Sequence, residues 1–175
     1  FEPLADAHEI LRKNAILDDK WAIFRRCAIG SKAAITTINV AGNSGSSSML
    51  DMLPRHLNAA PESRYSSKQD IEVITLDSVF EEISKGHQNI FLKIDTQGYE
   101  HEVLAGATES LKKIKAVQLE LSTAPLYSSQ YLYDYFFEFF KSNGYALWGL
   151  TPGFSDPKSG ELLQFDALFV KQETR

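Results

Sequence analysis

The sequence predicts an α/β protein in which helices cover both faces of a mainly parallel, doubly wound sheet. Three observations lead to this prediction. Strand-like and helix-like segments alternate along most of the chain, residues 90–94 form a compact apolar segment typical of a buried strand, and two aromatic segments at 145–150 and 163–170 can pair as a hairpin. Alternation implies right-handed crossovers between parallel strands, and the hairpin adds an antiparallel strand at or near one edge.

The first 41 residues are expected to contain a helix and parts of three strands. A strand ends at residues 1–2, and residues 4–15 follow with apolar side chains at helical spacing. Residues 21–29 and 33–41 carry the aromatic, aliphatic and β-branched side chains of two further strands. The first helix therefore lies between two strands, as a doubly wound sheet requires.

Residues 42–70 lose all periodicity and are rich in Ser, Gly, Asn and Pro. A structureless stretch of about this length inside a compact domain is uncommon and is usually a lid, a binding loop or a mobile segment. The sequence therefore predicts a long loop over residues 42–70, and a disordered surface loop is an equally good interpretation of the composition.

After this loop, residues 73–140 are predicted to form further strands and helices. Ser78 and Glu81 have the spacing of a capping box, which predicts a helix that begins there and ends near Gly86. The polar turn at residues 95–98 follows the buried strand. The expected elements are strands at 73–76, 90–94 and 116–121, and helices at 78–86, 104–114 and 132–140, the last capped by Ser128 or Ser129.

Composition places the chain among ordinary globular proteins. With 175 residues, 43% of them hydrophobic, it has the length of one domain, expected over residues 1–175. A net charge of −5 without a basic cluster disfavours nucleic acid as a partner, and no apolar run is long enough for a membrane span. A single cysteine fits a reducing, cytoplasmic location. The chain begins at Phe1 rather than Met, so we expect it to be trimmed at its N-terminus.

Acidic side chains follow the predicted strands at the edge where ligands bind in such sheets. Glu2 could accept hydrogen bonds from the two hydroxyls of an adenosine ribose, or could simply stabilise the start of the first helix. Asp95 and Glu120 could accept a proton, with Lys93 tuning their pKa, or the three side chains could form a structural ion pair. The residues alone leave these alternatives open.

Several familiar sites have no counterpart in the sequence. The four histidines are not spaced as metal ligands, so no metal site is expected. Cys27 is expected to be a strand residue rather than a nucleophile. The glycine-rich phosphate-binding motifs and the hydrolase nucleophile motif are missing.

An ordered set of segments resembles the FkbM-type family of S-adenosylmethionine-dependent methyltransferases. The most specific segment is LKIDTQGYEHEVLAGA at residues 92–107. The other matching segments are residues 1–3, 27–30, 46–50, 75–77, 119–122, 125–127 with Gln130, 153–154 with Asp156, and 163–170. Together they cover nearly the whole chain.

The resemblance implies a Rossmann-like class I methyltransferase fold and the cofactor S-adenosyl-L-methionine. In that fold a glycine-rich loop after the first strand holds the methionine part of the cofactor. Residues 1–3 are similar to the end of the second strand, so the first strand and its loop are expected to lie upstream, and the domain is expected to be N-terminally incomplete. Carried over, Glu2 would bind the ribose, Ala28 and Ile29 would line the adenine, and Asp95 would lie beside the transferring methyl group.

The resemblance also implies an acceptor, a hydroxyl of a small molecule or glycan. Methyl transfer needs alignment and the removal of water, and an oxygen acceptor needs a base for its proton. Asp95 is the first candidate for this base and Glu120 the second. Tyr127 and Gln130 would contact the acceptor, and the loop at 42–70 could close over it.

Two other functions compete with O-methyl transfer. A non-catalytic Rossmann-like binding or interaction domain would have this fold without a loop able to bind the cofactor. A nicotinamide-dependent oxidoreductase would share the acid after the second strand, but this function does not account for residues 92–107. The sequence indicates neither the particular acceptor nor an oligomeric state.

Overall fold

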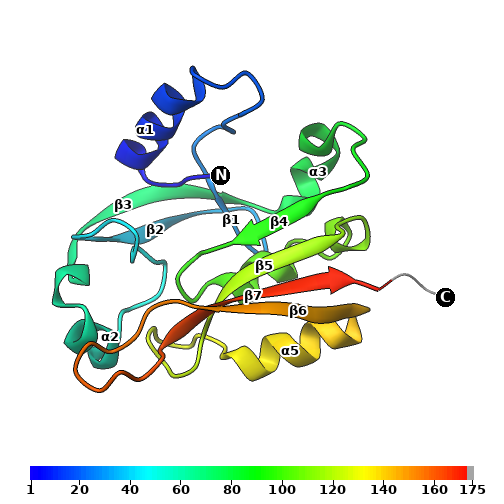
Figure 1. Cartoon of the computed structure of the whole chain (residues 1–175). Helices are drawn as coiled ribbons and strands as arrows, with labels where there is room; N and C mark the ends of the chain where they lie inside the picture. Colours follow the sequence, from blue (N-terminus) through cyan, green and yellow to red (C-terminus); the bar gives the residue numbers. More distant parts are fainter. Residues whose placement is uncertain (173–175) are drawn as a thin grey trace.

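The computed structural model describes residues 1–172 as a mixed α/β fold with two sheets and five α-helices (Figure 1). The strands are β1 (Ala28–Ile29), β2 (Ala34–Ala41), β3 (Tyr65–Ile74), β4 (Phe91–Ile94), β5 (Ala116–Ser122), β6 (Tyr145–Pro152) and β7 (Gln164–Lys171). The helices are α1 (Ala5–Ala15), α2 (Pro54–Ala59), α3 (Leu76–Ser84), α4 (Glu100–Ala105) and α5 (Tyr133–Ser142), with 3₁₀ turns η1 (Pro61–Ser63) and η2 (Ser110–Lys112).

The strands form two sheets rather than the single, mainly parallel sheet expected from the sequence. One sheet has the order β1-β3-β2 and the other β4-β5-β7-β6. Only β1–β3 and β4–β5 pair in parallel, whereas β2–β3, β5–β7 and β6–β7 are antiparallel. The C-terminal hairpin is confirmed, and β7 lies inside the sheet with β6 at its edge. Within residues 1–172, one edge each of β1 and β4 has no strand partner.

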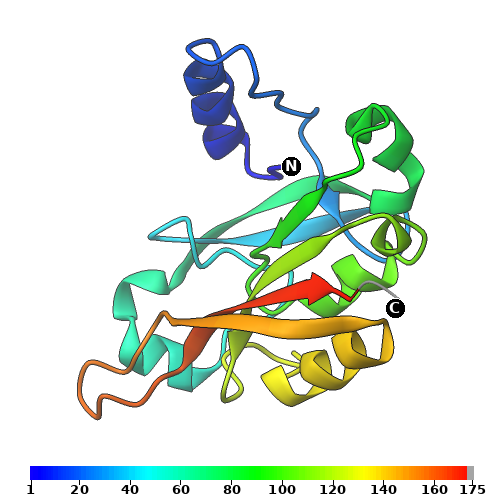
Figure 2. The ribbon, with the colours of Figure 1, turned by 45° about the vertical axis from the view of Figure 1, so that its right-hand side comes forward.

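One apolar core nevertheless joins the two sheets. Val117, Leu119 and Leu121 alternate along β5 and are at most 1% exposed, as a strand with one buried face requires. The face they form packs against α3, α4 and α5, and the same core includes residues of β1 and β3. Phe140 of α5 stacks on Phe169 of β7 with ring centroids 4.3 Å apart. Figure 2 shows α5 packed along the β6–β7 hairpin and α1 set apart at the opposite end of the molecule.

Residues 42–70 differ most from expectation. The long-loop prediction is wrong over residues 54–70, which contain α2, η1 and the first half of β3. That part of β3 is polar and exposed, and it forms by backbone pairing with β2, so the hydrophobic pattern gives no sign of it. The remaining loop is anchored, because Asn39 and Ser48 form an isolated β-bridge and Met52 forms another with Tyr127.

Several predicted boundaries also shift. Strand structure within residues 21–29 is limited to β1. Helix α3 begins one turn earlier than a cap at Ser78 would place it, because the hydroxyl of Thr75 accepts the hydrogen bond from the Ser78 amide. The predicted helix at 104–114 is split into α4 and η2, and Leu132 precedes α5 without a side-chain cap. No helix among residues 1–172 is long and apolar enough to cross a bilayer.

Candidate functional site

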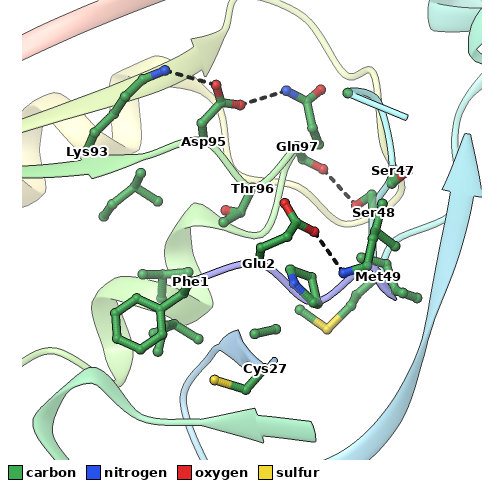
Figure 3. A pocket seen from close by; sticks show the side chains of 18 of the residues that line it. Phe1, Glu2, Cys27, Ser47, Ser48, Met49, Lys93, Asp95, Thr96 and Gln97 are labelled. Atoms are coloured by element: carbon green, nitrogen blue, oxygen red, sulfur yellow. Dashed lines mark hydrogen bonds and ion pairs between the residues drawn. The ribbon is translucent and has the colours of Figure 1, made fainter. Parts of the chain in front are cut away.

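A cavity of about 450 Å³ lies between the N-terminal segment, β1, the loop at residues 44–49 and the end of β4 (Figure 3). Its volume is in the range of small-molecule sites. Four side chains predicted to bind a cofactor, Glu2, Ala28, Ile29 and Asp95, all line it. These residues come from three segments far apart in the sequence, and the fold brings them to one place.

One side of the cavity combines apolar walls with a carboxylate. Ala28 and Ile29 are buried in β1, and Met49 faces the same space from the loop. Glu2 lies before α1, where its Oε1 accepts a hydrogen bond from the Leu4 amide at 2.7 Å. Its Oε2 accepts no hydrogen bond within residues 1–172 and is free to accept one from a ligand.

The turn after β4 adds a second acid to the cavity lining. Asp95 follows β4 and accepts two hydrogen bonds, at Oδ2 from the Lys93 ammonium at 3.2 Å and at Oδ1 from the Gln97 amide at 2.9 Å. Both members of the Lys93–Asp95 ion pair are about half exposed. Burial lowers the pKa of Lys93, but the hydrogen bond and negative charge of Asp95 outweigh burial and raise the pKa above its usual value.

Glu120 lies behind Asp95 on β5 and does not line the cavity. Its Oε2 accepts hydrogen bonds from Gln97 Nε2 at 2.6 Å and from Gln164 Nε2 at 2.8 Å. Burial and the negative charge of Asp95 raise the pKa of Glu120 to about 7. The structure therefore links Asp95 and Glu120 through an amide, and Lys93 pairs with Asp95 only.

The two residues predicted to contact an acceptor occupy other positions. Tyr127 is 1% exposed, and its hydroxyl donates to Gln97 Oε1 at 2.9 Å and contacts the Ser46 carbonyl oxygen at 3.2 Å. Gln130 Oε1 accepts from the backbone amides of Leu126 and Tyr127. Neither Tyr127 nor Gln130 lines the cavity. Tyr127 instead supports the acidic turn from behind.

Three polar residues at the site were not predicted from the sequence. Gln97 bonds to both acids, Ser48 donates its hydroxyl to the Gln97 carbonyl oxygen at 2.8 Å, and Glu100 accepts three hydrogen bonds from the turn. The carboxylate of Glu100, placed just after a polar turn and at the start of a helix, is a sequence signal that could have indicated its role. The roles of Gln97 and Ser48 depend on contacts between distant segments.

The residues that line the cavity have part of the chemistry that a nucleoside cofactor would need. The apolar wall and the free Glu2 oxygen fit an adenosine, since a carboxylate at this position of an α/β fold accepts hydrogen bonds from ribose hydroxyls. Among residues 1–172, no glycine-rich strand-to-helix turn faces the cavity, and no three His, Cys, Asp or Glu side chains gather as a metal would require.

The mixed α/β fold is consistent with a methyltransferase-like protein, and its pocket combines apolar walls with an acidic turn after β4. The family model of the methyltransferase FkbM domain matches residues 1–147. The chain belongs to this family of methyltransferases. No curated protein and no solved structure matches the chain.

Proposed function

We propose that the protein transfers a methyl group from S-adenosyl-L-methionine to a hydroxyl oxygen of a small molecule or glycan. Family membership supports methyl transfer. The observation that carries the cofactor assignment is the cavity itself, where Glu2, Ala28, Ile29 and Asp95 converge from three remote segments. An apolar wall with a carboxylate at one end is suited to a nucleoside, and a second acid at the other end is suited to the reacting group.

In this proposal each side of the cavity binds one part of the donor. Ala28 and Ile29, which line the cavity, would contact the adenine, and Glu2 Oε2 would accept hydrogen bonds from the ribose hydroxyls. Asp95 then lies at the reacting end. The bound cofactor supplies an electrophilic methyl group on a sulfonium.

Two carboxylates of the chain are placed to accept the proton of the acceptor hydroxyl. When the methyl group moves to the acceptor oxygen, the proton of that hydroxyl would pass to a carboxylate of the chain. Asp95 is the proposed base because it lines the cavity, while Lys93 and Gln97 hold its two oxygens in place. Glu120 is the second candidate, since it lies one amide away and its raised pKa suits proton transfer near neutral pH.

The doubly wound arrangement is part of the same proposal. The unpaired edges of β1 and β4 belong to strands that contribute to one core, and Ala28, Ile29 and Ile94 from these strands line the cavity. β1 is buried, and a buried strand rarely leaves such an edge without a partner. We propose that the two sheets are parts of one Rossmann-like sheet, joined by a further strand along the free edges of β1 and β4, whose glycine-rich loop would reach the cavity near Glu2 and Asp95.

Calorimetry with S-adenosylmethionine and its demethylated product, S-adenosylhomocysteine, tests the assignment. We expect Glu2→Gln to weaken binding at least tenfold, because loss of a hydrogen bond to a charged group is worth about 1.5–3 kcal/mol. Glu9→Gln on α1, an exposed acid paired with Lys13, is the matched control and should bind normally. Asp95→Asn should reduce kcat with a donor-dependent acceptor assay far more than it reduces affinity.

The competing function is a non-catalytic binding domain. The observation that favours it is the lack of a glycine-rich cradle facing the cavity within residues 1–172. Absence of heat with either ligand at high protein concentration would refute the methyltransferase proposal and favour this alternative. Binding of both ligands without turnover for any hydroxyl acceptor would refute O-methyl transfer while keeping the cofactor site.

A further inference from the structure

Gln97 has an unusual number of contacts for a residue in a turn. Its side-chain amide donates to Asp95 Oδ1 at 2.9 Å and to Glu120 Oε2 at 2.6 Å, and its amide oxygen accepts from the Tyr127 hydroxyl at 2.9 Å. Its backbone oxygen accepts from the Ser48 hydroxyl at 2.8 Å. Both N–H donors of the amide are therefore used, one on each candidate base (Figure 3 shows the contacts to Asp95 and Ser48).

The orientation of this amide is determined by its neighbours. The Tyr127 hydroxyl also contacts the Ser46 carbonyl oxygen, an acceptor, so its proton is shared between Ser46 O and Gln97 Oε1. Reversing the amide would place its oxygen against two carboxylates. The observed orientation is the only one that gives Asp95 and Glu120 a donor each.

The backbone of Gln97 is held in a strained conformation. Its φ of 53° is in the left-handed region, which is unfavourable for a residue with a side chain. Glu100, 3% exposed, keeps the turn in this shape, because its Oε1 accepts from the Thr96 amide, the Thr96 hydroxyl and the Gly98 amide on either side of Gln97. Strain maintained by a buried carboxylate next to a ligand cavity points to a role in the site.

The electrostatic surroundings make these two donors important. Glu120 faces the negative charges of Asp95, Glu100 and Asp166, and the Lys93 ammonium pairs with Asp95. The Tyr127 hydroxyl, which also contacts Gln97, is neutral and does not offset these negative charges. Near these acids, the N–H that Gln97 donates to Glu120 favours the ionised form of Glu120, as does the bond from Gln164.

We propose that Gln97 is a positioning residue of the methyl-transfer site, which couples Asp95 and Glu120 into one hydrogen-bonded pair and holds one oxygen of each carboxylate in place for proton acceptance. The inference rests on the proposed function, since the acids need this arrangement only if one of them takes the acceptor's proton. A residue whose role was merely structural would support the turn without changing how the acids titrate.

The test compares wild-type protein with Gln97→Met, which lacks both donors, and Gln164→Met, which loses a donor to Glu120 but has no contact with Asp95. Carboxyl NMR titration should show a higher pKa for Glu120 in both variants, and the carboxyl signal of Asp95 should move only in the Gln97 variant, which alone loses a hydrogen bond to Asp95. The acid limb of the kcat profile should move by about one pH unit in Gln97→Met, equal to an about tenfold loss of kcat below that limb. Calorimetric affinity for the donor should fall far less than kcat.

Gln97→Asn provides a second variant if the Met variant does not fold. Asn adopts the left-handed conformation more readily and retains an amide, but it is one methylene too short to reach both acids. It should keep the thermal midpoint and still shift the titration of at least one acid. Folded variants that titrate like wild type overturn the inference. No turnover and no donor binding in the wild type overturn the proposed function instead, and the NMR titration then decides by itself whether Gln97 couples the acids.

Discussion

Replacing Glu120 by Gln should stabilise the protein at high pH relative to low pH, while it slows methyl transfer. The pKa of Glu120 is raised to about 7 in the folded protein by burial and by Asp95, against an ordinary value of 4.5. The folded protein therefore keeps this proton to a higher pH than the unfolded chain, and the wild type loses stability as the pH rises from 4.5 to 7. Gln has nearly the same shape, keeps an oxygen that accepts from Gln97 and Gln164, and does not titrate.

The size of the effect follows from the two pKa values. Each unit between them corresponds to about 1.4 kcal/mol, so the stability of the Gln variant relative to wild type should increase by up to about 3 kcal/mol between pH 4.5 and pH 8. At 175 residues, each kcal/mol is worth about 2–4 °C in the thermal midpoint. The relative midpoint should therefore rise by several degrees over this range.

Urea unfolding and thermal melts of both proteins at half-unit pH steps measure the difference. Glu138→Gln, an exposed acid on α5, is the matched control and should show a constant difference within about 0.5 kcal/mol. A difference between Glu120→Gln and wild type that stays flat between pH 4.5 and 8 would refute the reasoning. So would a Gln variant that loses stability relative to wild type as the pH rises.

Three further predictions concern stability. Gly98→Ala should cost about 1–3 kcal/mol in urea unfolding, because Gly98 has φ +94° and an added Cβ would lie 3.2 Å from atoms of Tyr127; an unchanged midpoint would contradict this. Asp77→Ala should lower the free energy of unfolding by about 1–2 kcal/mol at pH 7, since Asp77 accepts four hydrogen bonds at the start of η2, two of them from Ser110. These hydrogen bonds outweigh burial and lower the pKa of Asp77. The loss of stability should shrink as the pH falls below 3.8, and a loss independent of pH would be the contrary result. Burial lowers the pKa of His56, whose Nδ1 has no partner within residues 1–172. The unfolded chain therefore binds a proton more readily than the folded protein, and the wild type loses stability as the pH falls below 6.5. His56→Phe should reduce this loss in unfolding measurements at pH 5 and 7, and an equal loss in both proteins would disprove it.

Local patterns predicted the elements with apolar faces well. The strand expected at 116–121 is β5 at Ala116–Ser122, and the stripe expected at 132–140 is α5 at Tyr133–Ser142. Both elements bury one face, which leaves a periodic signature in the sequence. The start of β3 leaves none, because Tyr65–Asp70 is polar and is held by backbone hydrogen bonds to β2.

In the candidate site, too, some residues could be predicted from local sequence and others could not. Asp95 could be predicted, because ligands in α/β sheets bind where the strands end and Asp95 follows β4. Glu2 also lines the cavity, although the strand expected to end at residues 1–2 is not present in the structure. Tyr127 and Gln130 could not be placed, since their positions depend on how the 120–131 segment turns back under the site. Gln97 was overlooked because a glutamine in a turn has no distinctive pattern.

The sequence by itself determined the class of fold, the family and the chemistry available at the strand ends, because burial periodicity and short motifs are local properties of the chain. Only the tertiary structure decided that the strands form two sheets with free edges at β1 and β4, and that one amide joins Asp95 to Glu120. The physical reason is that a hydrogen bond or a pKa depends on atoms a few ångströms apart in space. Gln97 and Glu120 are 23 residues apart in the sequence, and the fold brings them to 2.6 Å.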